Sequence, residues 1–489
     1  MKRFSLLPCV VISAVITSTM LLGSSPKADD GKIPITTSSE AAKKEYLQGR
    51  DLADNLRVTD ALGHFDKALA LDSTFAMAHL ARANASGSAK EFFGHLKMAV
   101  AHSGKASEGE RLLILANEAG ASAAAPKQKE YLEKLVAAYP KDERAHFTLG
   151  GYFSNQQNNA KAIEHYKQSV QLAPTYPPVY NSLGYAYLQT ENYPEAEKTF
   201  KRYTELIPND PNPHDSYAEL LMKMGRFDES ITYYKKALAV DPNFVASYSG
   251  LAMNYVQKGM PEEGAAVLKK YYDLARNDGE RRAALYNQAV LYVDAGKLDL
   301  AVGEMDKAYA IAEKAHDMLN MSGDITAKGN ILTEMEKYDA AVAAFENSVQ
   351  KSDASDVSQA VKDNVRLFHH LSLASVEIAR KDLKKAKAEA GEFRKGAEAG
   401  RNPNQVRLTH GLAGRIALAE KDYDKAIGEL LQSNLQDPYE LYRLASAYQA
   451  KGDKAKAKEY YEKAAHFNGL PNLNYACVRT KAAKMSGAM

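Results

Sequence analysis

Hydrophobic residues along most of this chain recur at spacings of three and four, with polar residues between them, which is typical of amphipathic helices. The clearest stretch, VYNSLGYAYLQTENYPEAEKTFKRYTELIP at residues 179–208, has two such runs on either side of the polar turn QTENYP. No segment shows the strict alternation of a strand. The pattern therefore predicts an all-α fold built from helical hairpins.

The hairpin recurs every 34 residues. Pro174, Pro208 and Pro242 follow one another at this step, and Leu149-Gly150 returns as Leu183-Gly184. Three further columns keep the step: Phe153, Tyr187, Leu221 and Tyr255; Tyr166, Phe200 and Tyr234; and Ala162, Ala196 and Ser230. A single hairpin cannot bury its own apolar face, so the units are expected to stack on their neighbours.

Each column has an expected physical role. A small residue in each helix, such as Gly184 and Ala196, lets the two backbones approach closely. Phe200 lies four residues after Ala196 on the same helix face, and we expect it to fill the gap to the next unit. Pro208 lacks an N–H group and is expected to end the second helix.

These residues resemble the landmarks of the tetratricopeptide repeat (TPR) family. The family's Leu-Gly, aromatic, Ala, aromatic and Pro positions fall on Leu183-Gly184, Tyr187, Ala196, Phe200 and Pro208. The match is specific over residues 143–244 and looser elsewhere. There the small second-helix residue falls on Ala61, Gly264, Ala301, Ala341, Ala386, Ala426 and Ala457. The resemblance implies an all-α, right-handed superhelical solenoid of about twelve stacked helical hairpins.

The repeats and their flanks divide the chain into six parts. They are a signal peptide or N-terminal anchor (1–23), a flexible linker (24–40), degenerate TPR-like repeats (41–142), regular TPR repeats (143–244), irregularly spaced repeats (245–471), and a capping helix and tail (472–489). Thr37-Ser-Ser-Glu40 fits a capping box, in which each side chain binds the other residue's free backbone N–H. The first ordered helix is therefore expected to begin there.

The first residues predict export. Lys2 and Arg3 precede an uncharged run from Phe4 to Leu22, which is the composition of a secretory signal peptide. The expected location is the periplasm or cell envelope. The alternatives are a secreted protein, an uncleaved anchor formed by residues 4–22, or a buried helix of the mature chain. Only an uncleaved segment would insert the mature chain into a membrane.

The charge balance and the Cys count narrow the possible classes of protein. Lys and Arg total 63 against 61 Asp and Glu, and this balance disfavours a general nucleic-acid binder. Of the two Cys, cleavage of a signal peptide would leave Cys477, which we expect to be buried in a helix.

The sequence offers few candidate catalytic or metal-binding residues. None of the common hydrolase, nucleotide-binding or metal-binding motifs is present in the sequence. His369 and His370 are adjacent and point to different helix faces, so they are not expected to hold one metal. Gly414, after His410, is expected to serve close packing. The sequence thus predicts no enzyme, cofactor or metal.

The resemblance places the binding surface on the concave side, along the fifth, ninth and twelfth repeat positions. Carried onto this chain, the predicted groove consists of Phe147, Asn181, Tyr185, Asp215, Glu219, Met253, Tyr286 and Asn287. Rings and amide groups suit an extended protein segment, although the same residues also suit a merely solvated groove. Some TPR domains grip a carboxylate with Lys and Arg. In this chain the middle repeats offer only two basic residues for that role, Arg144 and Lys223. The four acidic residues there disfavour it: Asp215, Glu219, Asp294 and Glu334.

The sequence therefore predicts an exported TPR scaffold that binds a partner protein in its groove, without bond chemistry. A structural assembly factor of an envelope complex, acting through its convex face and ends, is the first alternative. An enzyme, or the regulatory subunit of one, is the second. Nothing in the sequence identifies the partner.

Overall fold

A computed structural model describes residues 31–487, and over that range it contains 25 α-helices, one short 3-10 helix (Ser103–Lys105) and no strand. The predicted signal or anchor, residues 1–23, lies outside the described residues, as do residues 24–30 of the predicted linker. The first twelve helices are α1 (Glu40–Asp54), α2 (Val58–Leu71), α3 (Ala76–Asn84), α4 (Ala89–His102), α5 (Glu108–Ala121), α6 (Ala125–Ala138), α7 (Glu143–Asn155), α8 (Asn159–Leu172), α9 (Pro177–Gln189), α10 (Tyr193–Leu206), α11 (Pro211–Lys223) and α12 (Phe227–Val240). The remaining helices are α13 (Ala246–Gln257), α14 (Pro261–Leu274), α15 (Asp278–Asp294), α16 (Leu298–Lys314), α17 (Met318–Glu334), α18 (Tyr338–Asp353), α19 (Gln359–Arg380), α20 (Leu383–Gly400), α21 (Pro403–Ala419), α22 (Tyr423–Leu430), α23 (Pro438–Lys451), α24 (Lys454–Ala465) and α25 (Leu473–Gly487).

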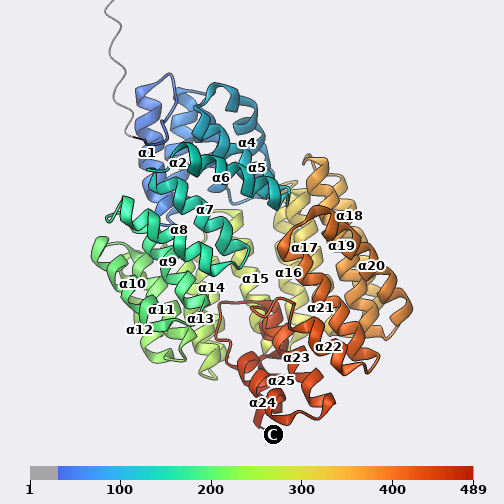
Figure 1. Cartoon of the computed structure of the whole chain (residues 1–489). Coiled ribbons are helices and arrows are strands. Elements are labelled where there is room, and N and C mark those ends of the chain that lie inside the picture. The colour runs from blue at the N-terminus through green and yellow to red at the C-terminus, as the bar shows by residue number, and fades with distance from the viewer. Residues whose placement is uncertain (1–30, 488–489) are drawn as a thin grey trace, which may run out of the picture.

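Consecutive helices pack as twelve hairpins, from α1–α2 to α23–α24, and α25 follows the last of them. The predicted all-α fold of about twelve stacked hairpins is confirmed (Figure 1). Residues 41–142 lack several of the repeat landmarks and nevertheless form three hairpins of the same kind. Their helical periodicity was sufficient to fold them this way without the landmark residues.

The ends of the helices follow the 34-residue period. Pro174, Pro208 and Pro242 each lie two residues after the second helix of a hairpin, as predicted for a residue without an N–H group. Within the hairpins, the turn uses a left-handed residue at the same step: Gln157 (φ 58°), Glu191 (φ 57°), Gly225 (φ 75°) and Gly259 (φ 76°). Two of these are Gly, which adopts positive φ without a steric cost.

Close packing between the helices of a hairpin depends on a Gly opposite a large side chain. A Cβ atom on Gly184 would lie 2.6 Å from the ring of Phe200, and one on Gly150 would lie 2.7 Å from the ring of Tyr166. The same relation, always 16 residues apart, joins the pairs Gly49 and Phe65, Gly329 and Phe345, and Gly414 and Leu430. Phe200 therefore packs inside its own hairpin, whereas the sequence analysis assigned it to the gap before the next unit.

An extended segment, residues 31–39, precedes α1, and we call it the strap. The Ile33 amide donates to Asp142 Oδ2 at 2.8 Å, and the Thr36 amide donates to Glu110 Oε1 at 2.9 Å. Lys32 also pairs with Glu143. This part of the predicted flexible linker is thus fixed along α5 and α7, because acidic side chains there accept its backbone N–H groups.

The start of α1 also differs in detail from the expected capping box. Ser39 is the N-cap and accepts a hydrogen bond from the Ala42 amide at 3.2 Å. Thr37, the predicted cap, instead donates to Asp72 Oδ2 at 2.7 Å. The helix begins at Glu40, as expected, but Thr37 contributes to fixing the strap.

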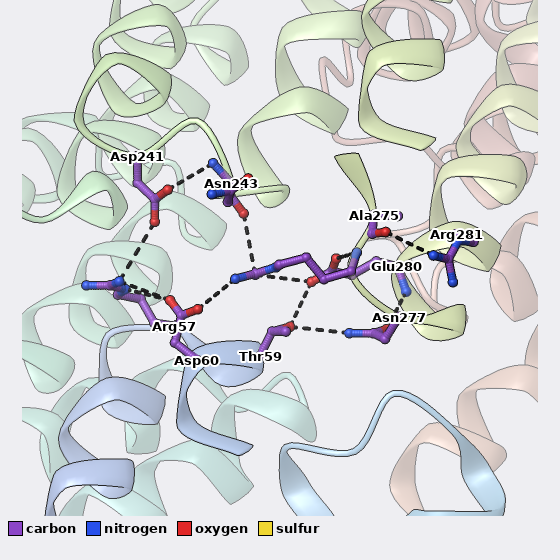
Figure 2. A network of polar contacts seen from close by, with 10 residues as sticks. Arg57, Thr59, Asp60, Asp241, Asn243, Ala275, Asn277, Glu280 and Arg281 are labelled. Atoms are coloured by element: carbon purple, nitrogen blue, oxygen red, sulfur yellow. Dashed lines mark hydrogen bonds and ion pairs between the residues drawn. The ribbon is translucent and has the colours of Figure 1, made fainter. Parts of the chain in front are cut away.

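Successive turns of the solenoid touch one another. The hydroxyl of Thr59, in α2, donates to Glu280 in α15 at 2.7 Å, and Arg276 pairs with Asp60 at 2.6 Å. Figure 2 shows this network, in which Arg57 also pairs with Asp60. The first and eighth hairpins are therefore joined directly, although more than 200 residues separate them.

Similar contacts join other distant parts of the array. The Lys90 amide in α4 donates to Asp317 at 3.0 Å, and the side chain of Asn404 in α21 donates to the Asn155 carbonyl at 3.0 Å. In Figure 1 the blue and teal helices accordingly lie against yellow and orange ones. Successive turns of the solenoid therefore pack against each other along much of the array.

Helix α25 packs on α24 and α23 and also reaches α15. Arg479 holds Asp294 with two hydrogen bonds, of 2.6 and 2.5 Å, and Gln257 donates to the Tyr475 hydroxyl at 3.1 Å. The predicted capping helix therefore packs not only on the last repeat but also on the inner side of the middle repeats.

No helix among the described residues is both long enough and apolar enough to cross a membrane.

Candidate functional site

The odd-numbered helices form the inner wall of the solenoid. From α1 to α23 each is the first helix of a hairpin, and neighbouring odd helices, such as α9 with α11 and α11 with α13, contact one another directly. The predicted groove residues all lie on five of these helices, α7, α9, α11, α13 and α15. The inner wall is therefore the surface on which a binding site has to be sought.

Several of the predicted groove residues form hydrogen bonds between adjacent inner helices. The Tyr185 hydroxyl donates to Glu219 Oε2 at 2.7 Å, and Asn181 accepts from Ser216 at 2.9 Å. Further along, Asp215 accepts from Ser247 at 2.6 Å, and Asn287 donates to Ser249 at 2.6 Å. The fold brings these residues together as a polar ladder that ties α9, α11, α13 and α15.

Burial changes the acidity of this ladder. Asp215 is 8 % exposed, and burial raises its pKa to about 7, a shift that the Ser247 hydrogen bond limits. Burial likewise raises the pKa of Glu219, with the Tyr185 hydrogen bond opposing the shift. The sequence analysis counted these two acidic residues against a carboxylate clamp, and burial favours their neutral forms.

Two more of the predicted groove residues are covered by protein. Met253 is 2 % exposed and belongs to the core between α11, α13 and α15. Tyr286 packs against Leu473 and Cys477 of α25. Neither side chain is free to meet a ligand in this arrangement, because Met253 lies in the core and Tyr286 lies under α25. The sequence pattern did not reveal that α25 returns to α15.

Phe147 is the predicted groove residue that lines an open cavity. This N-terminal cavity has a volume of about 450 Å³ and lies between the strap, α1, α3, α5 and α7. The Phe147 ring meets the ring of Tyr176 edge to face, with centroids 5.6 Å apart. Tyr46 and Leu113 add further apolar surface.

Two arginines supply charge in the N-terminal cavity. Arg144 pairs with Asp54 at 2.6 Å and lies over the Tyr176 ring at 4.7 Å. Arg50 also lines the cavity, and its Nε is buried without a hydrogen-bond partner. The cavity thus has aromatic walls, one guanidinium that is paired with a carboxylate (Arg144) and one with an N–H that lacks a partner (Arg50). This composition suits a peptide segment.

The cations considered for a carboxylate clamp are both occupied. Arg144 is held by Asp54, and the Lys223 ammonium donates to the Phe467 carbonyl at 2.6 Å while lying over the Phe467 ring. Asp294 and Glu334, counted against the clamp, bind Arg479 and Lys481 of α25.

A second cavity, of about 500 Å³, lies on the inner wall of the C-terminal repeats. Arg415 lines it and follows Gly414 directly, as Tyr185 follows Gly184. The repeat step that located Tyr185 therefore also identifies Arg415, but the predicted groove was carried only as far as residue 287. The wall that α25 contributes had no comparable signal in the sequence.

The histidines and the cysteine considered in the sequence have ordinary environments. His370 Nδ1 lies 2.7 Å from Glu389, and the ring centroids of His369 and His370 are 6.3 Å apart. Within residues 31–487, no three His, Cys, Asp or Glu side chains gather in a way that would hold a metal ion. Cys477 is partly buried, and burial raises its pKa to about 12.

Comparison with known proteins agrees with the repeat pattern. Residues 129–177, 155–220 and 441–465 match models described as tetratricopeptide repeat, and residues 218–259 match one described as TPR repeat. The chain carries tetratricopeptide repeats. Such arrays are typically non-catalytic scaffolds. No curated protein matches the chain.

Three solved structures are similar to parts of this chain. The crystal structure of MamA protein is 20% identical over 34% of this chain and 91% of its own, with a TM-score of 0.29. A tetratricopeptide repeat protein from Parabacteroides merdae is 14% identical over 56% of this chain and 94% of its own, with a TM-score of 0.36. The APC/C hetero-tetramer Cut9-Hcn1 is 12% identical over 89% of this chain and 79% of its own, with a TM-score of 0.40.

Proposed function

We propose that this TPR protein is a non-catalytic scaffold of the cell envelope that holds an extended segment of a partner protein in the N-terminal part of its groove. The observation that supports this most directly is the strap. This inner surface already binds an extended stretch of chain, with Asp142 and Glu110 accepting its backbone N–H groups. The cavity lies beside the strap and has room for more chain.

Phe147 and Tyr176 are the expected anchors of the partner. Aromatic side chains at the centre of an interface tend to supply most of its binding energy. The two rings meet edge to face at the wall of the cavity, and Arg50 beside them has a buried N–H without a partner. A partner segment with an apolar side chain next to a carboxylate or a free backbone carbonyl fits these groups.

Site-specific photo-crosslinking in the native host tests the site. A photoreactive phenylalanine analogue is placed at residue 147, and a matched one at Tyr272, which is 39 % exposed on an outer helix, α14. We expect one partner to crosslink through residue 147 and not through residue 272. Phe147→Ala should then weaken binding of that partner about tenfold or more, at about 1.4 kcal/mol for each factor of ten.

Crosslinks from residue 272 alone would place the interaction on the convex face and favour the assembly-factor alternative. Tyr185 and Tyr286 are less suitable for this test than the sequence indicated, because one bonds Glu219 and the other packs under α25.

Export is a separate part of the proposal and rests on the composition of residues 1–23. Fractionation of the native host, with N-terminal sequencing, should find a shortened chain in the envelope. An intact chain at the membrane would indicate the anchor formed by residues 4–22, and a shortened chain in the medium would indicate secretion. A cytoplasmic chain that keeps Met1 would contradict export.

A further inference from the structure

The cavity in the C-terminal repeats, which we call the C-terminal cavity, is built differently from the N-terminal cavity. Its wall is formed by the inner helices α17, α19, α21 and α23, and α25 closes one side of it. Its volume of about 500 Å³ falls within the range of roughly 300–1,000 Å³ that is usual for small-molecule sites. Because α25 occupies the groove here, the remaining space suits a compact ligand better than a continuous chain.

The lining of the cavity is partly apolar and partly polar. Its apolar part, which we call the apolar wall, comes mainly from α18, α19 and α21 through Phe345, Phe368, Leu371, Leu408 and Leu412. Charged and hydroxyl groups of α17, α21 and α23 line the rest, including Glu334, Arg415, Tyr439 and Glu440. A ligand that fills this space therefore needs an apolar body and a polar end.

Arg415 is the incompletely paired charge in this cavity. Its Nη1 donates to the Ser375 hydroxyl at 3.0 Å, and no carboxylate oxygen of the described residues lies within 4.0 Å of its guanidinium. A guanidinium has five N–H donors, so most of the hydrogen-bonding capacity of Arg415 is unused by protein groups. Arg144, Arg282, Arg443 and Arg479 differ, since each has a carboxylate partner, whereas Arg50 of the N-terminal cavity resembles Arg415 in having an N–H without a partner.

The acidic groups near Arg415 are already engaged elsewhere. Glu334 accepts from the Tyr439 hydroxyl at 2.8 Å and pairs with Lys481, while Asp437 accepts from the Asn474 side chain at 2.7 Å. Glu440 binds Arg443 through Oε1. Withdrawal from solvent, with Arg443 nearby, lowers the pKa of Arg415 to about 10, but the guanidinium remains a cation at neutral pH.

Glu440 adds a second unsatisfied group. The residue is 6 % exposed and lines the cavity, and its Oε2 atom is buried without a hydrogen-bond partner. A buried carboxylate oxygen without a donor is costly, as is a buried cation without a counter-ion. The cavity therefore presents both a donor fork and an acceptor that a ligand can complete.

We propose that this cavity is a binding site for a small amphiphilic carboxylate, in which Arg415 receives the carboxylate and the apolar wall receives the body of the ligand. The planar fork of a guanidinium matches the two oxygens of a carboxylate, and such charge-assisted hydrogen bonds are among the strong ones. Glu440 Oε2 accepts from a hydroxyl or N–H group where the ligand has one. The site is separate from the proposed partner groove and does not depend on it.

The experiment uses the full chain and sodium octanoate as the probe, with binding measured by calorimetry and thermal unfolding. Octanamide, which has the same body without the charge, is the matched ligand control. Arg415→Met removes the charge and keeps the length of the side chain. Arg394→Met is the matched protein control, because Arg394 lies half-exposed on an outer helix, α20, and pairs with Glu398.

We expect octanoate to bind the wild-type chain and the Arg394 variant, to raise their unfolding temperatures, and to bind better than octanamide. Arg415→Met should lose about tenfold or more in affinity, since it removes hydrogen bonds to a charged group. Without ligand, this variant should unfold at the same or a higher temperature, because it removes a partly buried charge that has no carboxylate partner among the described residues. A purely structural Arg415 would instead lower the unfolding temperature when replaced.

Leu371→Phe is a second variant, which leaves Arg415 intact and narrows the cavity because Phe is larger than Leu. It should also weaken octanoate binding. Equal affinity of octanoate for the wild-type chain and Arg415→Met would overturn the proposal. So would the failure of octanoate and N-acetyl-phenylalanine to bind the wild type. A hydrophobic peptide with a free C-terminus that binds here while both small acids do not would overturn it as well, in favour of a peptide site.

Discussion

At the scale of single residues, the hairpins depend on places where no side chain fits. A Cβ atom on Gly184 would lie 2.6 Å from the Phe200 ring, and Phe200 is fully buried, so its ring has little room to move away. Gly303, in α16, has nothing within 4 Å of an added Cβ atom. The two positions therefore separate the effect of close packing from the effect of losing a Gly.

We predict that Gly184→Leu lowers the free energy of unfolding by about 1–3 kcal/mol, the usual cost of overpacking. Gly303→Leu should be neutral or slightly stabilising, since Leu is a better helix former than Gly. Hydrogen exchange should rise in α9 and α10 of the Gly184 variant and change little beyond residue 400. Unchanged protection around Gly184 would contradict the packing described for this hairpin.

The raised pKa of Asp215 predicts that the stability of the fold depends on pH. Burial raises its pKa from 3.8 to about 7, so the folded chain keeps a proton that the unfolded chain loses near pH 4. Stability therefore falls as the pH rises from about 4 to 7, by up to a few kcal/mol at about 1.4 kcal/mol for each pKa unit. Asp215→Asn keeps the acceptor for Ser247 and removes this loss.

Denaturant unfolding at pH 5 and pH 8 measures the effect. The stability advantage of Asp215→Asn over the wild type should be larger at pH 8 than at pH 5. Asp356→Asn is the control, because the Asp356 side chain is 99 % exposed. An advantage that is the same at both pH values would show that Asp215 ionises normally in the folded chain.

At the scale of elements, α25 belongs to the inside of the array as much as to its end. The side chain of Asp294, in α15, is 7 % exposed and is held by Arg479 of α25. We predict that Arg479→Met destabilises the chain by about 3–5 kcal/mol, because it leaves a buried carboxylate without a partner. Chemical denaturation measures the loss.

The pair can be separated from the general packing of α25 by a double-mutant cycle. Adding Asp294→Asn to Arg479→Met should recover most of the lost stability, because the unpaired charge is then gone. If the double variant is as unstable as the single one, Arg479 acts through its packing and not through the charge of Asp294.

The sequence predicted the elements well because their determinants are local. The 34-residue step, the apolar spacing and the prolines all act within one hairpin or between neighbours, and together they correctly predicted twelve hairpins. The determinants of the strap are not local. Ile33 and Thr36 are held by carboxylates 109 and 74 residues away, and no periodic pattern marks residues 31–39.

The candidate site was predictable in part for the same reason. The repeat step places Phe147 and Tyr185 on the first helices of their hairpins, where the structure has them, and the same step carried further would have placed Arg415 there too. It did not reveal which of these side chains bond one another or lie under α25. Those contacts depend on the curvature of the whole array, to which every repeat contributes and which no single repeat encodes.

At the scale of the whole molecule, the contacts between turns set this array apart from an open solenoid, in which each repeat meets only its neighbours. Gly279 and Gly87 lie close together between two turns, and a Cβ atom on Gly279 would lie 2.4 Å from the Gly87 carbonyl oxygen. The clash is with backbone, so it cannot be relieved by a side-chain rotation.

We predict that Gly279→Leu separates the two turns while the hairpins remain folded. Small-angle scattering should show a larger radius of gyration than for the wild type, and circular dichroism should show unchanged helix content. Gly303→Leu again serves as the control. An unchanged radius would mean that the network in Figure 2, rather than this close approach, sets the spacing of the turns.

The bonds from Thr59 to Glu280 and from Arg276 to Asp60 have one more consequence, for how the gene can change. Open solenoids readily gain or lose a unit by duplication or deletion, because a new unit only has to fit its two neighbours. Here an added unit between the first and eighth hairpins would carry α15 out of register with α2 and break the bonds between them. The packing of successive turns therefore constrains the number of units in this segment, and divergence by substitution or in the outer loops is easier to accommodate.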